Sequence, residues 1–394
     1  MSVGVDPVEL TERVKREARR LGFDLVGVTD PDPPPHLDVF ERWLEAGRQG
    51  EMHYLSTERS LARRADPRRI LPECQSILVV AANCLPGPTP DQDGSARIAA
   101  YARGEDYHEV LVERLRRLVA YIQDQTGLKD LPHRIYTDTG PLLERELAQR
   151  AGLGWIGKNT CLINPEHGSH FLLAEVMLAI RLVPDTPFPA DRCGSCTRCI
   201  EACPTECILP DRTLDATRCI SYLTIELKGA IPAGLRSSIG NWVFGCDVCQ
   251  EVCPWNVRFS RPTRDPAFQP TPTLADPRPQ DFLDLHPTGW RARLRGTALL
   301  RAKRTGLVRN ACIVAGNRAS QEMVQPLAAV LSGDPDPVAR AHAAWGLGRI
   351  GGSGASKALH EAQTSEQDPE TLKEIAAALR ASEDAAANKK ARSA

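Results

Sequence analysis

Residues 193–208, CGSCTRCIEACPTECI, contain the feature that most constrains this chain. Four cysteines there follow a C-x2-C-x2-C-x3-C-P spacing, and the last of them, Cys203, directly precedes Pro204. Bacterial proteins use this spacing to hold two [4Fe–4S] clusters, because three thiolates bind one cluster and the fourth binds the other. The fold must therefore bring further ligands to this segment from elsewhere in the sequence.

A second cysteine segment, GCDVCQEVCPWN, spans residues 245–256 and also ends in a C-x3-C-P pattern. A complete run would carry one more cysteine at position 243, where Val243 stands. By the crossed rule, cluster one takes its fourth ligand from this segment, and cluster two takes the remaining cysteines. The predicted ligands of cluster one are Cys193, Cys196, Cys199 and Cys253. Those of cluster two are Cys203, Cys246, Cys249 and one further cysteine.

Cys207 and Cys219 are the two candidates for the missing ligand of cluster two. Cys207 lies inside the P-T-x-x-I turn that follows Cys203, where a small or apolar residue is needed, whereas Cys219 in TRCISYL stands free of that turn. We therefore assign Cys219. Structural zinc is the alternative, since C-x2-C pairs also form zinc ribbons, but two C-x3-C-P endings in one chain favour clusters. Four cysteines in apolar surroundings are expected to be buried small hydrophobes: Cys74, Cys84, Cys161 and Cys312.

Composition narrows the setting of these clusters. The chain has 394 residues, enough for two or three domains, and a net charge of −1 that predicts no anionic partner by itself. No apolar run approaches the roughly 18 residues of a membrane span, and the N-terminus is typical of a first helix and not of a signal peptide. Thirteen cysteines without a secretion signal favour metal ligation in a reducing compartment, so we expect a cytoplasmic protein without a membrane partner.

The order of expected elements predicts an α+β fold in three parts. Over residues 1–185, apolar strands alternate with helices. The expected strands are at 23–30, 76–85, 134–138 and 170–182, and the expected helices are at 9–21, at 108–127 and in a segment that Pro141 opens and Gly152 closes. Residues 186–262 form the predicted ferredoxin-like domain with two clusters. Proline-rich stretches mark both of its boundaries.

Residues 280–382 are expected to form helical repeats. VRNACIVAGN (308–317) aligns with ARAHAAWGLG (339–348), so the period is about 31 residues of helix, turn and helix. Such a period suggests two short HEAT-like repeats, although chance similarity between alanine-rich helices is an alternative.

Several motifs together resemble the epoxyqueuosine reductase family, which is related to reductive dehalogenases. They are YARGEDYH (101–108), DTGPLLER (138–145), AGLGWIGKN (151–159) and both cysteine segments, in unbroken order from about residue 10 to 260. The resemblance implies a reductive-dehalogenase-like α/β cobalamin domain over residues 1–185, in an enzyme with two [4Fe–4S] clusters. It implies reduction of epoxyqueuosine to queuosine at the wobble position of tRNA, with electrons relayed from an external donor of flavodoxin or ferredoxin type.

The resemblance also implies particular site residues. Asp138 would be the acid that protonates the opened epoxide, although its expected place at a helix start would favour the carboxylate, so that burial must raise its pKa. A capping role is the alternative for Asp138. The expected cobalamin contacts are Tyr101, Asp138, Lys158, Asn159 and Ser169. We do not expect His108 to ligate cobalt, because a lone His that opens an amphipathic helix is more often a capping or surface residue.

The segment WRARLRGTALLRAKRTGLVR (290–309) holds seven Lys or Arg residues and no acid. Such a run usually forms a solvated helix face, but beside HEAT-like repeats and an implied tRNA substrate it predicts phosphate contacts by Arg301, Lys303 and Arg304. We expect a monomer. Two other functions remain open: a dehalogenase-like reductase of a small molecule, and an electron carrier without catalysis.

Overall fold

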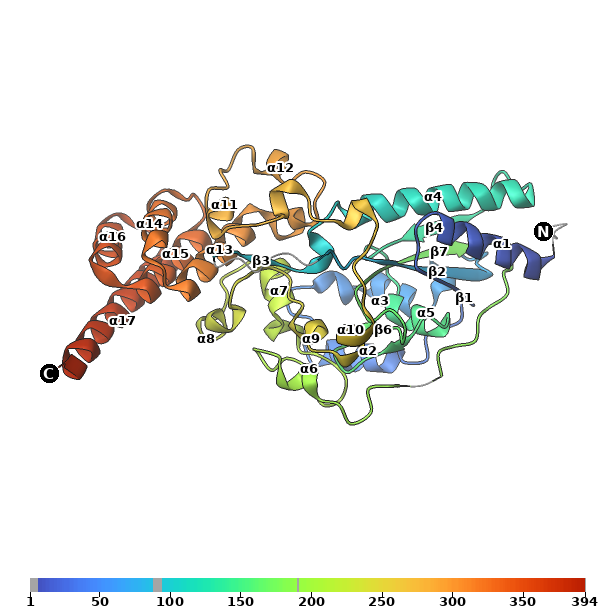
Figure 1. Ribbon diagram of the computed structural model, residues 1–394, viewed down its shortest axis with the longest axis horizontal. Coiled ribbons are helices and arrows are strands. Elements are labelled where there is room, and N and C mark those ends of the chain that lie inside the picture. The colour runs from blue at the N-terminus through green and yellow to red at the C-terminus, as the bar shows by residue number, and fades with distance from the viewer. Residues whose placement is uncertain (1–5, 88–93, 190, 394) are drawn as a thin grey trace. The chain divides into compact units, whose positions relative to one another are not determined.

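The structure, a computed structural model, describes residues 6–87, 94–189 and 191–393, with side chains up to residue 382. The chain divides into two compact units (Figure 1). Unit 1 comprises Met1–Pro88, Arg103–Thr217 and Asp247–Thr271, and unit 2 comprises Thr89–Ala102, Arg218–Cys246 and Pro272–Ala394. In the described residues, no helix is long and apolar enough to cross a membrane.

Unit 1 is built on a four-stranded antiparallel sheet in the order β1-β2-β7-β4. The strands are β1 (Leu25–Thr29), β2 (Ser76–Asn83), β7 (Phe171–Leu178) and β4 (His133–Tyr136). The two central strands, β2 and β7, are almost entirely buried. This burial explains their long apolar runs in the sequence, because helices cover both faces of the sheet.

Helices α1 and α4 lie on one face of this sheet and α5 on the other (Figure 1). Asp6 caps α1 through the backbone N–H of Val8, and Asp106 caps α4 through that of His108. Helix α4 ends where Gly127 takes a left-handed conformation, as its sequence predicts. The N-terminal helices of unit 1 are α1 (Pro7–Arg20), α2 (Leu37–Glu45), α3 (Glu58–Ala65), α4 (Tyr107–Thr126) and α5 (Glu144–Arg150).

The start of α5 differs from its prediction. The helix begins at Glu144, with Leu143 at the N-cap position and no side-chain cap, so Pro141 does not open it. Residues between β4 and α5 form a turn in which Asp138 has a φ of 56°. The prediction that Asp138 sits at a helix start is therefore wrong, and so is its alternative role as a helix cap.

The cysteine segments of unit 1 contain three short helices that pack together: α6 (Arg198–Glu201), α9 (Val248–Glu251) and α10 (Pro254–Phe259). In each segment a four-residue helix precedes the Cys-Pro pair, and α6 contacts α9. Cys253 occupies the N-cap position of α10, with Pro254 as the first helical residue. A small hairpin of β5 (Trp155–Ile156) and β6 (Leu162–Ile163) lies beside them, with Trp155, Ile163 and Cys253 in one hydrophobic cluster.

Unit 2 consists mainly of helices. Its helices are α7 (Ile220–Ile225), α8 (Ala233–Arg236), α11 (Pro279–Leu283), α12 (Trp290–Arg293), α13 (Lys303–Arg318), α14 (Val324–Gly333), α15 (Pro337–Ile350), α16 (Gly352–Ser365) and α17 (Pro369–Ser393). A two-stranded parallel ladder joins β3 (Arg97–Ile98) to β8 (Trp242–Phe244).

The HEAT-like repeats predicted for this region are confirmed. The two aligned segments lie in α13 and α15, which pack against each other, and α15 packs in turn against α17. Gly316 of α13 faces Gly346 of α15 so closely that a Cβ at position 316 would stand 2.8 Å from the Cα of Gly346. The small residues of the repeat therefore let the helices approach.

Candidate functional site

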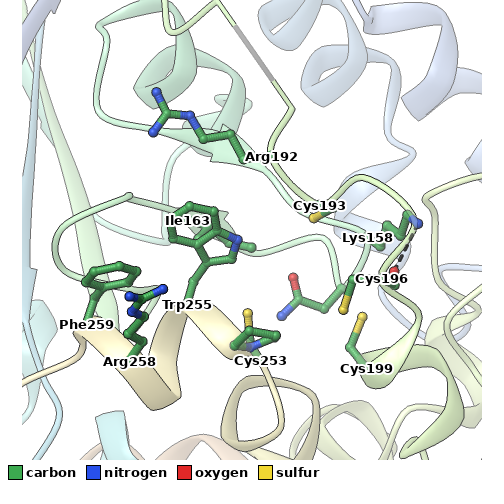
Figure 2. A pocket seen from close by; sticks show the side chains of 12 residues that line it. Lys158, Ile163, Arg192, Cys193, Cys196, Cys199, Cys253, Trp255, Arg258 and Phe259 are labelled. Atoms are coloured by element: carbon green, nitrogen blue, oxygen red, sulfur yellow. Dashed lines mark hydrogen bonds between the residues drawn. The ribbon is translucent and has the colours of Figure 1, made fainter.

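Four predicted ligands of cluster one surround a single cavity in unit 1. The cavity has a volume of about 290 Å³, and its lining includes Cys193, Cys196, Cys199 and Cys253. Figure 2 shows the four sulfur atoms around one end of this cavity, with Trp255 at the other end. Residues 60 positions apart in the sequence thus meet here, as the crossed ligand rule predicts.

The donor set of this cavity suits an iron–sulfur cluster. Sulfur is the only ligand type that the four cysteines offer, and soft thiolates favour Fe–S clusters or zinc. Among the described residues, no three His, Cys, Asp or Glu side chains are close enough to share one metal ion. The four thiols instead border a cavity, an arrangement that fits a cluster of several atoms better than a single zinc ion.

Lys158 and Asn159 contact the cluster-binding segments. The ammonium group of Lys158 donates to the backbone oxygens of Gly194 at 2.7 Å and Cys196 at 3.0 Å. Asn159 is 4% exposed, and its side-chain amide donates to the backbone oxygen of Cys249. Both side chains therefore brace the loops that carry the cysteines. That they also contact cobalamin stays a prediction.

Ser169 is similarly engaged. Its side chain is buried, and its hydroxyl oxygen accepts hydrogen bonds from Gln250 at 3.0 Å and Asn256 at 2.8 Å. These bonds tie Ser169 to α9 and α10, and its role as a cobalamin contact stays a prediction. Tyr101 lies in unit 2, in the 3-10 helix Ala100–Ala102, with its ring 6.3 Å from that of Phe244.

The predicted ligands of cluster two come from both units: Cys203 and Cys249 belong to unit 1, and Cys219 and Cys246 to unit 2. Val243, which replaces the expected cysteine, is fully buried in β8, and its backbone oxygen accepts a hydrogen bond from Asn310. The position is thus part of a core. Cys219 stands at the N-cap position of α7. Its assignment to cluster two stays a prediction.

Cys207, the alternative ligand, is buried, and its sulfur lies 3.5 Å from that of Cys203. A hydrogen bond from Cys207 is the main reason why the pKa of the Cys203 thiol falls to about 4. Cys207 thus contacts a predicted ligand of cluster two, and the choice of Cys219 over Cys207 as the fourth ligand stays a prediction. Of the four cysteines expected to be buried, Cys74, Cys84 and Cys312 are, whereas Cys161 is partly exposed.

A second group of polar side chains gathers around Asp138 in unit 1. The hydroxyl of Tyr107 donates to Oδ2 of Asp138 at 2.9 Å, and Nε2 of His108 lies 3.8 Å from the same oxygen. The Asp138 side chain is 67% exposed. A carboxyl group is therefore held at the end of the sheet by two neighbours from the first turn of α4.

His108 is a cation in this arrangement. Burial favours its neutral form, but the hydrogen bond to Asp106 and the nearby carboxylate of Asp138 outweigh burial and raise the pKa of His108 to about 9. Nδ1 of the ring lies 2.7 Å from Oδ1 of Asp106. Both ring nitrogens thus face carboxylates. That His108 does not ligate cobalt stays a prediction.

Two glutamates near Asp138 were not predicted as site residues. Glu144 accepts a 2.7 Å hydrogen bond from the backbone N–H of Asp138, and burial together with the charge of Asp138 raises the pKa of Glu144 to about 8. Glu175 on β7 is 0% exposed, and neither carboxyl oxygen has a hydrogen-bond partner among the described residues. Burial raises the pKa of Glu175 well above its usual range, so this side chain is a neutral acid. The sequence did carry a signal for Glu175, because an acid inside the apolar run HFLLAEVML is unusual and indicates a buried functional carboxyl.

The basic segment 290–309 divides into buried and exposed side chains. Arg304 is 9% exposed and forms a buried ion pair with Asp334, and Arg309 is fully buried against backbone oxygens of Leu223 and Leu227. Arg301 is exposed but forms a bidentate ion pair with Glu226 at 2.8 and 2.9 Å. The prediction that Arg304 contacts phosphate is therefore corrected, since its guanidinium is used inside the fold.

Three other side chains of this segment are exposed without an ion pair to a described acid: Arg291, Arg295 and Lys303. The guanidinium of Arg291 lies 5.2 Å from the centre of the Trp290 ring. A surface that combines exposed cations with a partly exposed aromatic ring suits a nucleic-acid backbone better than the buried Arg304 does.

Unit 1 has an α+β fold with a four-cysteine cavity and a carboxylate site, and unit 2 carries helical repeats. These features together define the class of protein as an iron–sulfur oxidoreductase. Family models agree with each part. "Epoxyqueuosine reductase QueG, DUF1730" matches residues 64–139, "4Fe-4S double cluster binding domain" matches 192–256 and "HEAT repeats" matches 297–380.

The chain belongs to the epoxyqueuosine reductase family. It is 39% identical over 354 residues to the epoxyqueuosine reductase of Pseudomonas aeruginosa, covering 88% of this chain and 96% of that protein. It is 36% identical to that of Escherichia coli, covering 88% and 91% of the two chains. Among solved structures, an epoxyqueuosine reductase with an epoxyqueuosine-modified tRNA-Tyr stem loop matches with a TM-score of 0.87 and 31% identity, over 95% of this chain and 99% of that one. The Bacillus subtilis enzyme, solved with a catalytic aspartate loop swung out of the active site, matches with a TM-score of 0.86 and 30% identity, over 95% and 99%.

Proposed function

We propose that this protein reduces epoxyqueuosine to queuosine at the wobble position of tRNA. The observation that carries the proposal is the match, over 95% of this chain, to an epoxyqueuosine reductase solved with the modified stem loop. The reaction removes the epoxide oxygen: two C–O bonds break, a C=C bond forms, and two electrons and two protons convert the oxygen to water. The protein must therefore supply electrons, protons and a position for the base.

Asp138 is the proposed proton donor to the epoxide oxygen. Its carboxyl group is exposed, so a substrate can reach it, and Tyr107 and His108 hold it from one side. A general acid must be protonated in the reacting complex, so a bound base and cofactor that exclude water would have to raise the pKa of Asp138. The mobility of the corresponding loop in the Bacillus subtilis relative supports a part for the turn around Asp138.

The neighbours of Asp138 are proposed to supply it with protons. Protonated His108 lies 3.8 Å from the Asp138 carboxylate and can return a proton to it after each transfer. Glu144 and Glu175 add acidic groups with raised pKa values in the same region. Because the reaction consumes two protons, a site with several protonated groups is better suited to it than one with a single acid.

The proposed cofactors are two [4Fe–4S] clusters and cobalamin. The cavity in Figure 2 fits cluster one, and the proposed ligands of cluster two are Cys203, Cys219, Cys246 and Cys249. When bound, reduced cobalamin would supply a strong nucleophile, its cobalt, that can attack carbon and open the epoxide. The proposed cobalamin contacts are Tyr101, Asp138, Lys158, Asn159 and Ser169. The carboxyl of Asp138 and the phenol of Tyr101 suit the amide groups of that cofactor.

Substrate binding is proposed to involve the exposed cations of the repeat region. Arg291, Arg295 and Lys303 can contact phosphates, which fixes the position of the tRNA, while the modified base supplies the specificity. For the reaction, this base must leave the anticodon stack and enter the site. We propose that the enzyme is a monomer. It would act in the cytoplasm, where tRNA and a one-electron donor of flavodoxin or ferredoxin type are present.

Expression in a bacterium that lacks its own epoxyqueuosine reductase tests this proposal. Nucleosides of its tRNA, separated and identified by mass, should change from epoxyqueuosine to queuosine when the chain is expressed. The matched variant Cys199→Ser should leave epoxyqueuosine in place, because it removes a proposed ligand of cluster one. Persistent epoxyqueuosine with the wild-type chain, present as full-length, iron-replete protein, would contradict the proposal and favour a reductase of small molecules.

A further inference from the structure

The rim of the cluster-one cavity carries positive charge without matching acids. Three of its twelve lining residues are cations, Lys158, Arg192 and Arg258, and none is an acid. Lys158 is used by backbone oxygens, but Arg192 and Arg258 are exposed. Neither arginine forms an ion pair with any acid in the described part of the chain. Their charge is therefore directed to solvent.

Aromatic rings, and not carboxylates, hold these two guanidinium groups. That of Arg192 lies 5.2 Å from the centre of the Phe188 ring, and that of Arg258 lies 5.4 Å from the centre of the Phe259 ring. Cation–π contacts orient a guanidinium without neutralising it. In Figure 2, Arg192 and Arg258 flank Trp255, on the side of the cavity away from Cys196 and Cys199.

Further exposed cations follow Arg258 in the segment RFSRPTR. Arg261 and Arg264 are both exposed, and Arg261 donates only to backbone oxygens, at 3.1 and 3.0 Å. Among the acids on the packed segments, Asp191 pairs with Arg212, and Glu201 accepts a hydrogen bond from Thr197 but keeps its charge. Glu166, Glu206 and Glu251 are further exposed carboxylates on these segments, and none of the three forms an ion pair with Arg192 or Arg258 in the described part of the chain.

The space between the cations and the cysteines is apolar. Trp255 stacks on Phe259 at 5.5 Å and meets Trp155 edge-on at 5.0 Å. Val257, on the same helix α10 but outside the cavity lining, is 71% exposed and adds apolar surface to that helix. An apolar patch bordered by unneutralised arginines is typical of a surface that binds an acidic protein partner.

We propose that a small acidic one-electron carrier protein docks on this surface and reduces cluster one. The inference rests on the proposed function, which needs two electrons per tRNA from outside the chain. At each encounter the carrier is oxidised by one electron and the cluster is reduced by one, with no bond formed and no proton moved, so two encounters supply one turnover. Arginine pairs rimming an apolar contact would guide the carrier to the cluster and let it leave again, as a transient partner must.

The test uses full-length, cluster-replete protein and purified reduced flavodoxin as the acidic probe. Replacing both arginines, Arg192→Glu with Arg258→Glu, should weaken flavodoxin binding at low salt about tenfold or more and slow reduction of the clusters by a similar factor. High salt should remove most of the difference. Dithionite, a small reductant, should reduce the variant as fast as wild type. The control Arg116→Glu with Arg117→Glu, on exposed positions of α4, should behave as wild type.

Three results would overturn the proposal. Unchanged flavodoxin binding would remove the surface as a docking site. Loss of iron, also in the milder pair Arg192→Gln with Arg258→Gln, would show that the arginines serve only to balance the charge of the cluster. Weaker tRNA binding with unchanged flavodoxin binding would assign the surface to RNA. None of these measurements requires queuosine formation, so failure of the proposed function would be seen separately.

Discussion

Replacing Asp138 with Asn separates proton donation from structure at the proposed site. Asn keeps the size of the side chain and tolerates the left-handed backbone, in which Asp138 has a φ of 56°. Its amide oxygen can still accept the hydrogen bond from Tyr107, and the backbone N–H of residue 138 can still donate to Glu144. What is lost is the acidic proton and the negative charge beside His108.

The expected effects on rate and stability differ in size. A positioned general acid contributes roughly 10²–10⁴ to the rate, or about 2.7–5.4 kcal/mol of transition-state stabilisation. Stability should change by less than about 1 kcal/mol, since the Asp138 side chain is 67% exposed and its Oδ2 lies 3.8 Å from Nε2 of His108. The pKa of His108 should fall below its value of about 9, because one of its two carboxylate neighbours is neutralised.

Single-turnover kinetics with saturating tRNA stem loop measure the chemical step. Asp138→Asn should bind the stem loop as wild type does and hold the same iron, but form queuosine at a rate lower by that factor. The control Asp130→Asn, at an exposed position of the same unit, should be unaffected. A rate for Asp138→Asn within about threefold of wild type would refute the assignment of this residue as the acid.

Three further predictions test other parts of the site. Cys219→Ser should lose about half of the bound iron in a direct iron assay, whereas Cys207→Ser should keep it; the reverse pattern would exchange their roles. Replacing Arg291, Arg295 and Lys303 with Ala should lower the slope of log affinity for tRNA against log salt by up to about 0.7–0.9 per lost phosphate contact. Arg304→Ala should instead mainly destabilise the fold, by about 3–5 kcal/mol, because it leaves Asp334 buried and unpaired. Glu175→Gln should stabilise the cofactor-free protein at pH 8 but hardly at pH 4. Because the pKa of Glu175 is raised in the folded state, wild type loses stability as the pH rises above about 4.5, the ordinary pKa of Glu, whereas Gln does not titrate. Thermal melts of both proteins at several pH values measure the difference, and a pH-independent difference would contradict the neutral state of Glu175.

Features with local causes could be predicted from the sequence. The spacing of the cysteines already implies which of them share a cluster, because a short helix between ligands sets the spacing, and Cys193, Cys196, Cys199 and Cys253 do border one cavity. The apolar runs that predict strands are long because helices cover both faces of the sheet. The period of the repeats follows from helix packing in the same way.

Features set by specific side-chain contacts, near or distant in the sequence, could not be predicted. The turn around Asp138 replaces the first turn expected of α5, because Glu144 bonds back to the backbone of Asp138 and Gly140 lies against the ring of Tyr136. Arg304 has the same charge as its exposed neighbours, but its partner Asp334 lies 30 residues away in the sequence. A run of charges does not reveal which of its members are buried.

Queuosine formation by purified protein tests the central claim most directly. The protein would be reconstituted anaerobically with iron, sulfide and cobalamin, reduced, and mixed with tRNA that carries epoxyqueuosine. We expect one queuosine for every two electrons consumed, and no product when either cobalamin or the iron–sulfur clusters are left out. Unchanged epoxyqueuosine after reaction with fully loaded, reduced protein would contradict the claim, and so would the same yield of queuosine without cobalamin.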